Sequence, residues 1–169
     1  MGVLSVHHWE DWRAGLDELC RVAPLRIVLT FDPVCHGDQW VIRDYVPEIG
    51  VLDAIRTSFD DVVDHLDAEV TVLPLTREFT DGVLGAFWCR PHAYLEPEIR
   101  SHMSGFAQVD PSVVERAMGR LADDLRTGSW DRRYADLVDS PTFDTGFRLL
   151  VSRSYLSRPA MVTLTSAIT

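Results

Sequence analysis

Two observations predict that the chain folds as an α/β domain. Short apolar segments of strand length alternate with longer segments whose apolar residues recur every three or four positions, which is the pattern of helices packed on a sheet. The 169 residues, of which 46% are hydrophobic, suffice for one domain with a sizeable core.

The first elements are predicted to form a strand–helix–strand unit. Residues 3–6 (VLSV) have the composition of a strand, and the apolar positions of 9–22 follow helical spacing. Asp11 lies near the start of this helix, where a negative charge suits the helix dipole. Residues 26–31 (RIVLTF) form a nearly continuous apolar run, which is typical of a strand covered on both faces.

The middle of the chain contains an irregular segment, a helix and a third strand. Residues 32–50 contain Pro33, Gly37 and Pro47, which we expect to interrupt regular structure. Ser58 can cap a helix that continues through residue 66. Residues 69–75 (EVTVLPL) follow as a strand candidate, and their proline predicts an edge strand or the end of the strand.

A helical block precedes the last strand. Helical spacing occurs in 81–88, 97–106 and 111–126, and two of these segments begin with a proline suited to a first helical turn. Gly128 follows as a C-cap, and 130–137 add a further turn. Residues 145–152 (TGFRLLVS) are predicted to be the final strand. The tail 154–169 remains unassigned, with 161–165 as a candidate edge strand.

Composition excludes several classes of protein. The formal charge of −10 argues against a nucleic-acid binder, which needs a basic surface. No apolar run approaches the roughly 18 to 20 residues of a membrane span, and the N-terminal residues lack the pattern of a signal peptide. The three cysteines form no C-x-x-C pair, so we expect a reducing, cytoplasmic location. All 16 basic residues are Arg, which excludes a Schiff-base lysine.

Four segments in collinear order carry a resemblance to a known family: VLSVHHWEDWRAGLDELCRVAPLRIVLTFDP (3–33), WVIRDYVPEI (40–49), TDGVLGAFWCRPHAYL (80–95) and DTGFRLLVSR (144–153). Together they resemble the C-terminal half of a class I S-adenosylmethionine-dependent methyltransferase, of the methyltransferase type 11-like, small-molecule branch. The resemblance implies that residues 1–153 form a partial Rossmann-like sheet of the last four strands. It also implies an antiparallel final strand, with a helical insert or lid at 76–143 before it.

The same resemblance implies methyl transfer from S-adenosylmethionine to a small organic acceptor. The family carries its Gly-rich cofactor loop on the first three strands, whereas this chain has no G-x-G and begins where the fourth strand is under way. We therefore expect the activity to be incomplete in this chain. The open alternatives are a truncated chain, a homodimer that covers the open sheet edge and completes the site, and a non-catalytic domain that acts through dimerisation or partner binding.

His7 and His8 are the candidate catalytic residues. They follow the end of a strand, which is the rim where ligands bind in open α/β sheets, and an imidazole there could take a proton or orient an acceptor. The alternative is that one of them only packs at the turn. By resemblance, Ser5, Val6 and His7 would contact the methionine end of the cofactor, although Ser5 and Val6 could equally be plain strand interior. Adjacent histidines rarely share one ion, so we expect no metal site.

Five further residues are candidates for binding the acceptor. Asp32 ends the second strand on the same rim, and Trp40 and Tyr45 follow it in the loop. Phe87 and Trp88 lie in the expected insert helix, where they could form a lid that keeps water out. Aromatic side chains with few polar groups suit an apolar or aromatic acceptor. The alternative for all four aromatic residues is the hydrophobic core.

Cys35 and His36 are adjacent in the loop after the second strand. A thiol and an imidazole together can form a nucleophile with its base. Side chains of adjacent residues seldom reach each other, so the spacing does not support a thiol hydrolase.

Overall fold

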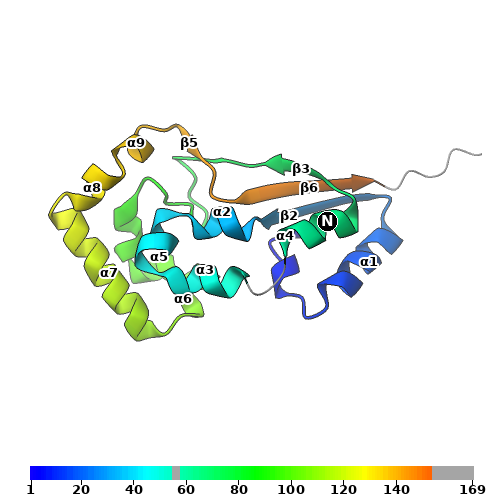
Figure 1. Ribbon diagram of the computed structural model, residues 1–169, viewed down its shortest axis with the longest axis horizontal. Coiled ribbons are helices and arrows are strands. Elements are labelled where there is room, and N and C mark those ends of the chain that lie inside the picture. The colour runs from blue at the N-terminus through cyan, green and yellow to red at the C-terminus, as the bar shows by residue number, and fades with distance from the viewer. Residues whose placement is uncertain (55–57, 154–169) are drawn as a thin grey trace, which may run out of the picture.

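The computed structural model describes residues 1–54 and 58–153, and its centre is a four-stranded mixed sheet (Figure 1). The strands lie in the order β1 (Gly2–Val3), β2 (Leu25–Phe31), β6 (Phe147–Arg153) and β3 (Glu69–Val72). β1 is parallel to β2, whereas β6 is antiparallel to both of its neighbours. The predicted α/β class and the antiparallel final strand are confirmed.

Two helices cover one face of this sheet. α1 (Trp12–Val22) and α4 (Phe59–Leu66) pack on the strands through a buried cluster: Val6, Trp12, Leu16, Val28, Val62, Leu66 and Leu150. Asp11 caps α1, because its carboxylate accepts a hydrogen bond from the Ala14 amide at 2.9 Å. Ser58 caps α4 in the same way, as the sequence predicts.

The other face of the sheet is largely open in the part of the chain that the structure describes. Val28 of β2 is fully buried beneath α1 and α4, whereas Leu25 is 46% exposed and Val3 of β1 is 50% exposed. Trp88 and its neighbours cover only the end of this face near Phe147. The prediction that β2 is buried on both faces is therefore wrong: an apolar run cannot show whether a covering layer is present.

β1 is shorter than the predicted strand 3–6. It ends at Val3 because Leu4 has a φ of +46°, which turns the chain out of the extended conformation. The Leu4 amide still donates to the Leu29 carbonyl at 2.8 Å, and the chain then enters a 3₁₀ turn, η1 (Val6–His8). The following helix correspondingly begins at Trp12 and not at residue 9.

The segment 32–50, predicted to be irregular, is mostly helical. It forms α2 (Pro33–Gly37), a π-helical turn η2 (Val41–Tyr45) and the start of α3 (Pro47–Ala54). Asp32 caps α2 by accepting from the amides of Val34 and Cys35. Pro33 and Pro47 begin helices, since a first helical position has no need of an amide hydrogen. The expectation that these prolines interrupt regular structure is therefore wrong.

Most other helices belong to a lobe beyond the sheet (Figure 1). They are η3 (Pro91–Leu95), α5 (Pro97–Ser101), α6 (Ser104–Ala107), α7 (Pro111–Arg126), α8 (Ser129–Arg133) and α9 (Ala135–Val138). α7 has the predicted bounds, and Gly128 follows it with a φ of +66°. The predicted helix 81–88 is wrong, because this segment is a series of turns in which Gly85 has a φ of +96°. The predicted helix 97–106 is divided between α5 and α6.

The lobe has an aromatic core of its own, with Trp40, Tyr94 and Trp130 among its buried residues. A short hairpin of β4 (Leu75–Thr76) and β5 (Thr142–Phe143) joins the two ends of the segment that forms the lobe. β3 ends at Val72 and lies at the edge of the main sheet, as Pro74 predicts.

The tail 154–169, with its candidate strand at 161–165, lies outside the described residues. Among the helices that the structure describes, none is long and apolar enough to cross a membrane.

Gly146 determines how β6 meets α2, and its replacement gives a first testable prediction. Its φ is +96°, and a Cβ atom would lie 2.9 Å from the His36 backbone nitrogen. We expect Gly146→Ala to lower the free energy of unfolding by about 1–3 kcal/mol, measured by urea denaturation. Gly119→Ala is the control, because a Cβ atom there meets nothing within 4 Å and the residue is in the middle of α7. Equal effects of the two substitutions would contradict this account.

Candidate functional site

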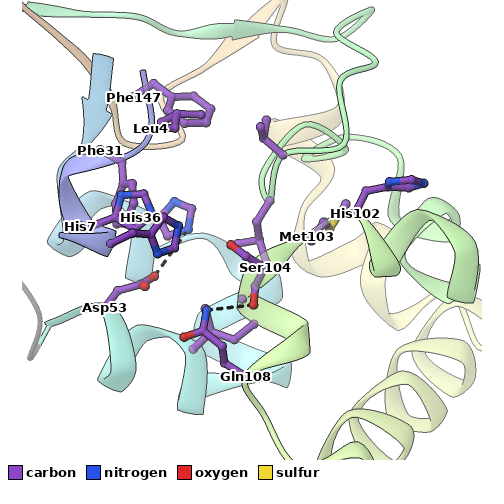
Figure 2. Close-up of a pocket in the computed structure, with 15 residues that line it drawn as sticks. Leu4, His7, Phe31, His36, Asp53, His102, Met103, Ser104, Gln108 and Phe147 are labelled. Carbon is purple, nitrogen blue, oxygen red and sulfur yellow. Dashed lines mark hydrogen bonds and ion pairs between the residues drawn. The ribbon is translucent and has the colours of Figure 1, made fainter. Parts of the chain in front are cut away.

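A cavity of about 130 Å³ lies at the carboxyl ends of β1 and β2, where they face α3 and α6 (Figure 2). Leu4, Ile49, Met103 and Phe147 contribute to its apolar wall. Imidazole, carboxylate, hydroxyl and amide groups contribute the polar part: His7, His8, His36, Asp53, Ser104 and Gln108. A cavity with an apolar wall and a few polar groups is the usual form of a small-molecule site.

The turn after β1 brings His7 and His8 to the cavity. Leu4, the residue with the left-handed backbone, also lines the cavity, and strained residues of this kind gather at functional sites. The His7 ring lies 4.0 Å from the His8 ring and 4.9 Å from the Phe31 ring. His8 is exposed, whereas His7 is partly buried. Both predicted catalytic residues therefore line the same cavity.

His36 projects from α2 into the same space and is nearly buried, with 8% of its side chain exposed. The Gln39 side-chain amide donates to the Thr145 carbonyl at 2.8 Å and also lies 2.8 Å from His36 Nδ1. An amide nitrogen carries two hydrogens and can donate to both acceptors. The Thr145 carbonyl oxygen itself lies 3.2 Å from His36 Nδ1, so these groups meet at one edge of the ring and the Nε2 edge faces Asp53.

The burial of His36 also fixes its charge. Loss of hydration lowers the pKa of His36 to about 4, while the Thr145 carbonyl acts in the opposite direction with a smaller effect. The ring is therefore neutral at pH 7.

Asp53 faces His36 from α3. Its Oδ2 lies 3.8 Å from His36 Nε2, and 11% of its side chain is exposed. Figure 2 shows the two side chains pointing toward each other at one side of the cavity. Asp53 and His7 also line a second, smaller cavity of about 20 Å³ beside Thr30, which is room for a single water molecule.

Helix α6 and the residue after its end form the outer side of the cavity. Ser104 and Gln108 are both exposed, and the Gln108 amide donates to the Ser104 carbonyl at 2.9 Å. The His102 ring points away from the cavity (Figure 2). The inner wall of the cavity thus carries His36 and Asp53, whereas the outer side formed by α6 is exposed to solvent.

The predicted cofactor residues Ser5 and Val6 lie beside this cavity and do not line it. Val6 is 1% exposed and packs with Leu16 beneath the sheet, so its side chain faces the core. Ser5 is half-buried in the turn between β1 and η1.

The predicted acceptor residues Asp32, Trp40 and Tyr45 lie elsewhere. The Asp32 carboxylate caps α2 and lies 3.7 Å from the Arg148 guanidinium. Trp40 is 3% exposed and donates from its indole nitrogen to the Trp88 carbonyl at 2.8 Å. Tyr45 is buried in the lobe and donates to Asp124 at 2.7 Å, and burial with this contact raises the pKa of its hydroxyl. Trp40 and Tyr45 belong to the lobe's core.

Phe87 and Trp88 lie in the turns before η3 and also outside the cavity. Phe87 packs against Tyr94 with ring centroids 6.0 Å apart, and the Arg90 guanidinium lies 4.6 Å from its ring. Trp88 is 1% exposed and packs near Phe143. The expected insert helix that would have carried them is not formed.

His36 and Asp53 were not identified as site residues from the sequence. The sequence suggested a role for His36 only together with its neighbour Cys35. Asp53 belongs to α3, and this helix begins in a segment that was predicted to be irregular. The Cys35 thiol instead contacts Asp32 at 3.3 Å, and burial together with that carboxylate raises the pKa of the thiol. No group of three or more His, Cys, Asp or Glu suited to a metal ion occurs within 1–54 and 58–153.

The comparison with solved structures gives a match to a crystal structure from Anabaena variabilis, described as "Putative methyltransferase from antibiotic biosynthesis pathway". The TM-score is 0.82 and the sequence identity 26%, over 89% of this chain and 64% of that chain. This chain therefore spans less than two thirds of that protein's length. Neither a protein-family model nor a curated protein matches the sequence. By structure, the chain resembles this methyltransferase-like protein over most of its own length.

Proposed function

We propose that the chain takes part in methyl transfer from S-adenosylmethionine to a small organic acceptor, and that it holds the acceptor in the cavity beside His7. The observation that carries this proposal is the position of the cavity. It lies at the carboxyl ends of the parallel strands β1 and β2, where α/β folds bind their ligands. The structural match to the protein from Anabaena variabilis supports the same reaction class.

The described residues do not form a complete cofactor site. S-adenosylmethionine would supply an activated methyl group when bound, but a cavity of about 130 Å³ suits one ring and not a nucleoside joined to an amino acid. β1 is the last strand on its side of the described sheet, and the sequence has no G-x-G loop for close backbone contacts with such a ligand. Ser5 is the nearest polar side chain at the end of β1.

The chain's own residues can nevertheless bind the acceptor and remove its proton. The apolar wall excludes water from the body of the acceptor, and the inner polar groups fix its orientation. An acceptor hydroxyl or amine must lose a proton during methylation, and the His7 imidazole lies in the cavity where it can accept one. We assign His7 this role, with His8 at the exposed edge of the same turn.

Two measurements on the purified chain test the proposal. Calorimetric titration with S-adenosylhomocysteine is expected to show weak 1:1 binding. Incubation with S-adenosylmethionine labelled in its methyl group, and with a panel of single-ring hydroxyl and amino compounds, is expected to give slow transfer of label. If neither binding nor transfer occurs, the proposal fails for this chain.

A second candidate function is a non-catalytic domain that acts through dimerisation. It is favoured by the open sheet face, on which Val3 and Leu25 are about half exposed next to the edge strand β1. Sedimentation equilibrium is then expected to show a dimer at micromolar concentration, which Leu25→Glu would dissociate. A monomeric chain would contradict this alternative.

A further inference from the structure

We propose that the lobe sets the size of the acceptor, so that the cavity admits one ring and excludes two fused rings. Three buried side chains form the wall that sets this limit, here called the lobe wall: Ile49, Leu84 and Met103. The inference rests on the proposed function for its role in methyl transfer, but the size limit itself can be measured by binding alone.

The lobe wall is part of a packed core. Ile49 comes from α3, Leu84 from the turns before η3, and Met103 from the residue before α6; they are 1%, 7% and 1% exposed. All three line the cavity and also belong to the buried core of the lobe that includes Trp40 and Tyr94. Side chains in a close-packed core cannot move aside without disturbing their neighbours. The lobe wall therefore has a fixed position.

The reacting end of the acceptor lies on the opposite side of the cavity. His7, the proposed base, follows β1, and Figure 2 shows it across the cavity from Met103. An acceptor that places its hydroxyl or amine group at His7 therefore extends toward the lobe wall. The sheet side thus serves the proton transfer, and the lobe limits how far the acceptor can extend.

The volume of the cavity indicates what this limit is. An engineered apolar cavity of about 150 Å³ binds benzene, and the present cavity of about 130 Å³ is close to that size. Phe31 contributes an aromatic surface, with its ring 4.9 Å from the His7 ring. One ring fits this space, whereas a second fused ring directed away from His7 would have to displace the lobe wall.

Gly105 of α6 lies behind two residues of the lobe wall. A Cβ atom on Gly105 would lie 3.1 Å from Ile49 Cγ2 and 3.3 Å from Leu84 Cδ1, which is tighter than ordinary contact. Both side chains are buried in the core of the lobe on one side and border the cavity on the other. An added methyl group would therefore push them into the cavity. Gly105→Ala reduces the space for the acceptor without changing a polar group.

Two probes that differ only in ring number test the size limit. Phenol and 2-naphthol are titrated against the purified chain, with ligand-observed NMR as the readout. Both carry one hydroxyl group, so their contact at His7 is the same. Phenol is expected to bind at least about 10-fold more tightly, although the larger apolar surface of 2-naphthol would favour it in a cavity without a size limit. Absence of phenol binding, or binding of 2-naphthol as tight as that of phenol, would overturn the proposal.

An enlarged cavity assigns the limit to the lobe wall. Leu84→Ala removes part of the wall and is expected to bind 2-naphthol at least as tightly as phenol. Leu75→Ala is the matched control, because Leu75 is 8% exposed but lies outside the cavity, and it should keep the preference for phenol. Unfolding by urea identifies a variant that fails to fold. A folded Leu84→Ala variant that still excludes 2-naphthol would contradict the role of the lobe wall.

A reduced cavity gives an independent test in the opposite direction. Gly105→Ala is expected to weaken phenol binding by about 5-fold. Gly119→Ala is its control, since a Cβ atom there meets nothing within 4 Å, and it should leave phenol binding unchanged. A folded Gly105→Ala variant with the original affinity for phenol would count against the proposal.

The outcomes separate this inference from the proposed function. A preference for phenol over 2-naphthol without any methyl transfer would refute the proposed function alone. Methyl transfer to 2-naphthol as fast as to phenol would refute the size limit alone.

Discussion

Replacing His7 by alanine is expected to lower the rate of methyl transfer by about 100-fold or more, while the chain remains folded. A positioned general base typically contributes a rate factor of about 10² to 10⁴. His7 is the partly buried imidazole of the turn after β1, with its ring 4.9 Å from Phe31 in the wall of the cavity. The measurement is transfer of labelled methyl groups to the best acceptor found in the panel.

The design of this experiment separates a catalytic role from a structural one. Added imidazole is expected to restore part of the activity of His7→Ala, because it can occupy the space that the side chain leaves. His92→Gln changes a histidine that is exposed and outside the cavity, and it should keep the original rate. A His7→Ala variant that is folded and fully active would exclude His7 as the base.

The free energy of unfolding is expected to fall by about 3 kcal/mol when the pH is lowered from about 6.5 to about 4, because of His36. The pKa of this residue is about 4 in the folded chain, against an ordinary value of 6.5. Between these values the unfolded chain binds a proton that the folded chain excludes, so acid favours unfolding. Below pH 4 both states carry the proton and the contribution of His36 becomes constant.

The comparison of two variants isolates this effect. Urea denaturation at pH 7, 5 and 4 is expected to show a weaker pH dependence for His36→Gln than for the original chain, and an unchanged dependence for His92→Gln. Asp44 and Asp144 have lowered pKa values, opposed in each case by burial, through contacts with Arg43 and with Arg148 respectively. The stability that these two carboxylates give the folded chain is lost as the pH falls below their ordinary pKa of 3.8, which lies outside the range from pH 7 to pH 4. Identical pH dependence of the original chain and His36→Gln would refute the account.

Much of the sheet and the longest helix could be predicted because their causes are local. β2 and β6 are apolar runs, α7 has a regular apolar spacing, and Asp11 and Ser58 cap their helices through residues three positions away. The wrong predictions also came from local sequence patterns. Proline residues that begin α2 and α3 have the same signature as prolines that interrupt a segment, and only the neighbouring packing distinguishes the two.

The candidate site was only partly predictable. His7 and His8 could be proposed because a strand end marks the ligand rim of an α/β sheet, and both line the cavity. Trp40 and Tyr45 have the composition of a binding surface, yet they pack in the lobe, since aromatic side chains serve a core and a pocket equally well. Whether any of these residues acts on an acceptor stays a prediction.

The sequence by itself determined the α/β class, the order along the chain of the four strands of the main sheet, and the position of His7 and His8 after the first strand. Only the tertiary structure decided that His36 and Asp53 meet, since these residues are 17 positions apart in sequence and belong to two different helices. It also decided the charge of His36, because the low pKa of this residue comes from burial among segments that are distant in sequence. Strand and helix patterns depend on neighbours along the chain, whereas a cavity and the pKa values in it depend on which segments pack against one another.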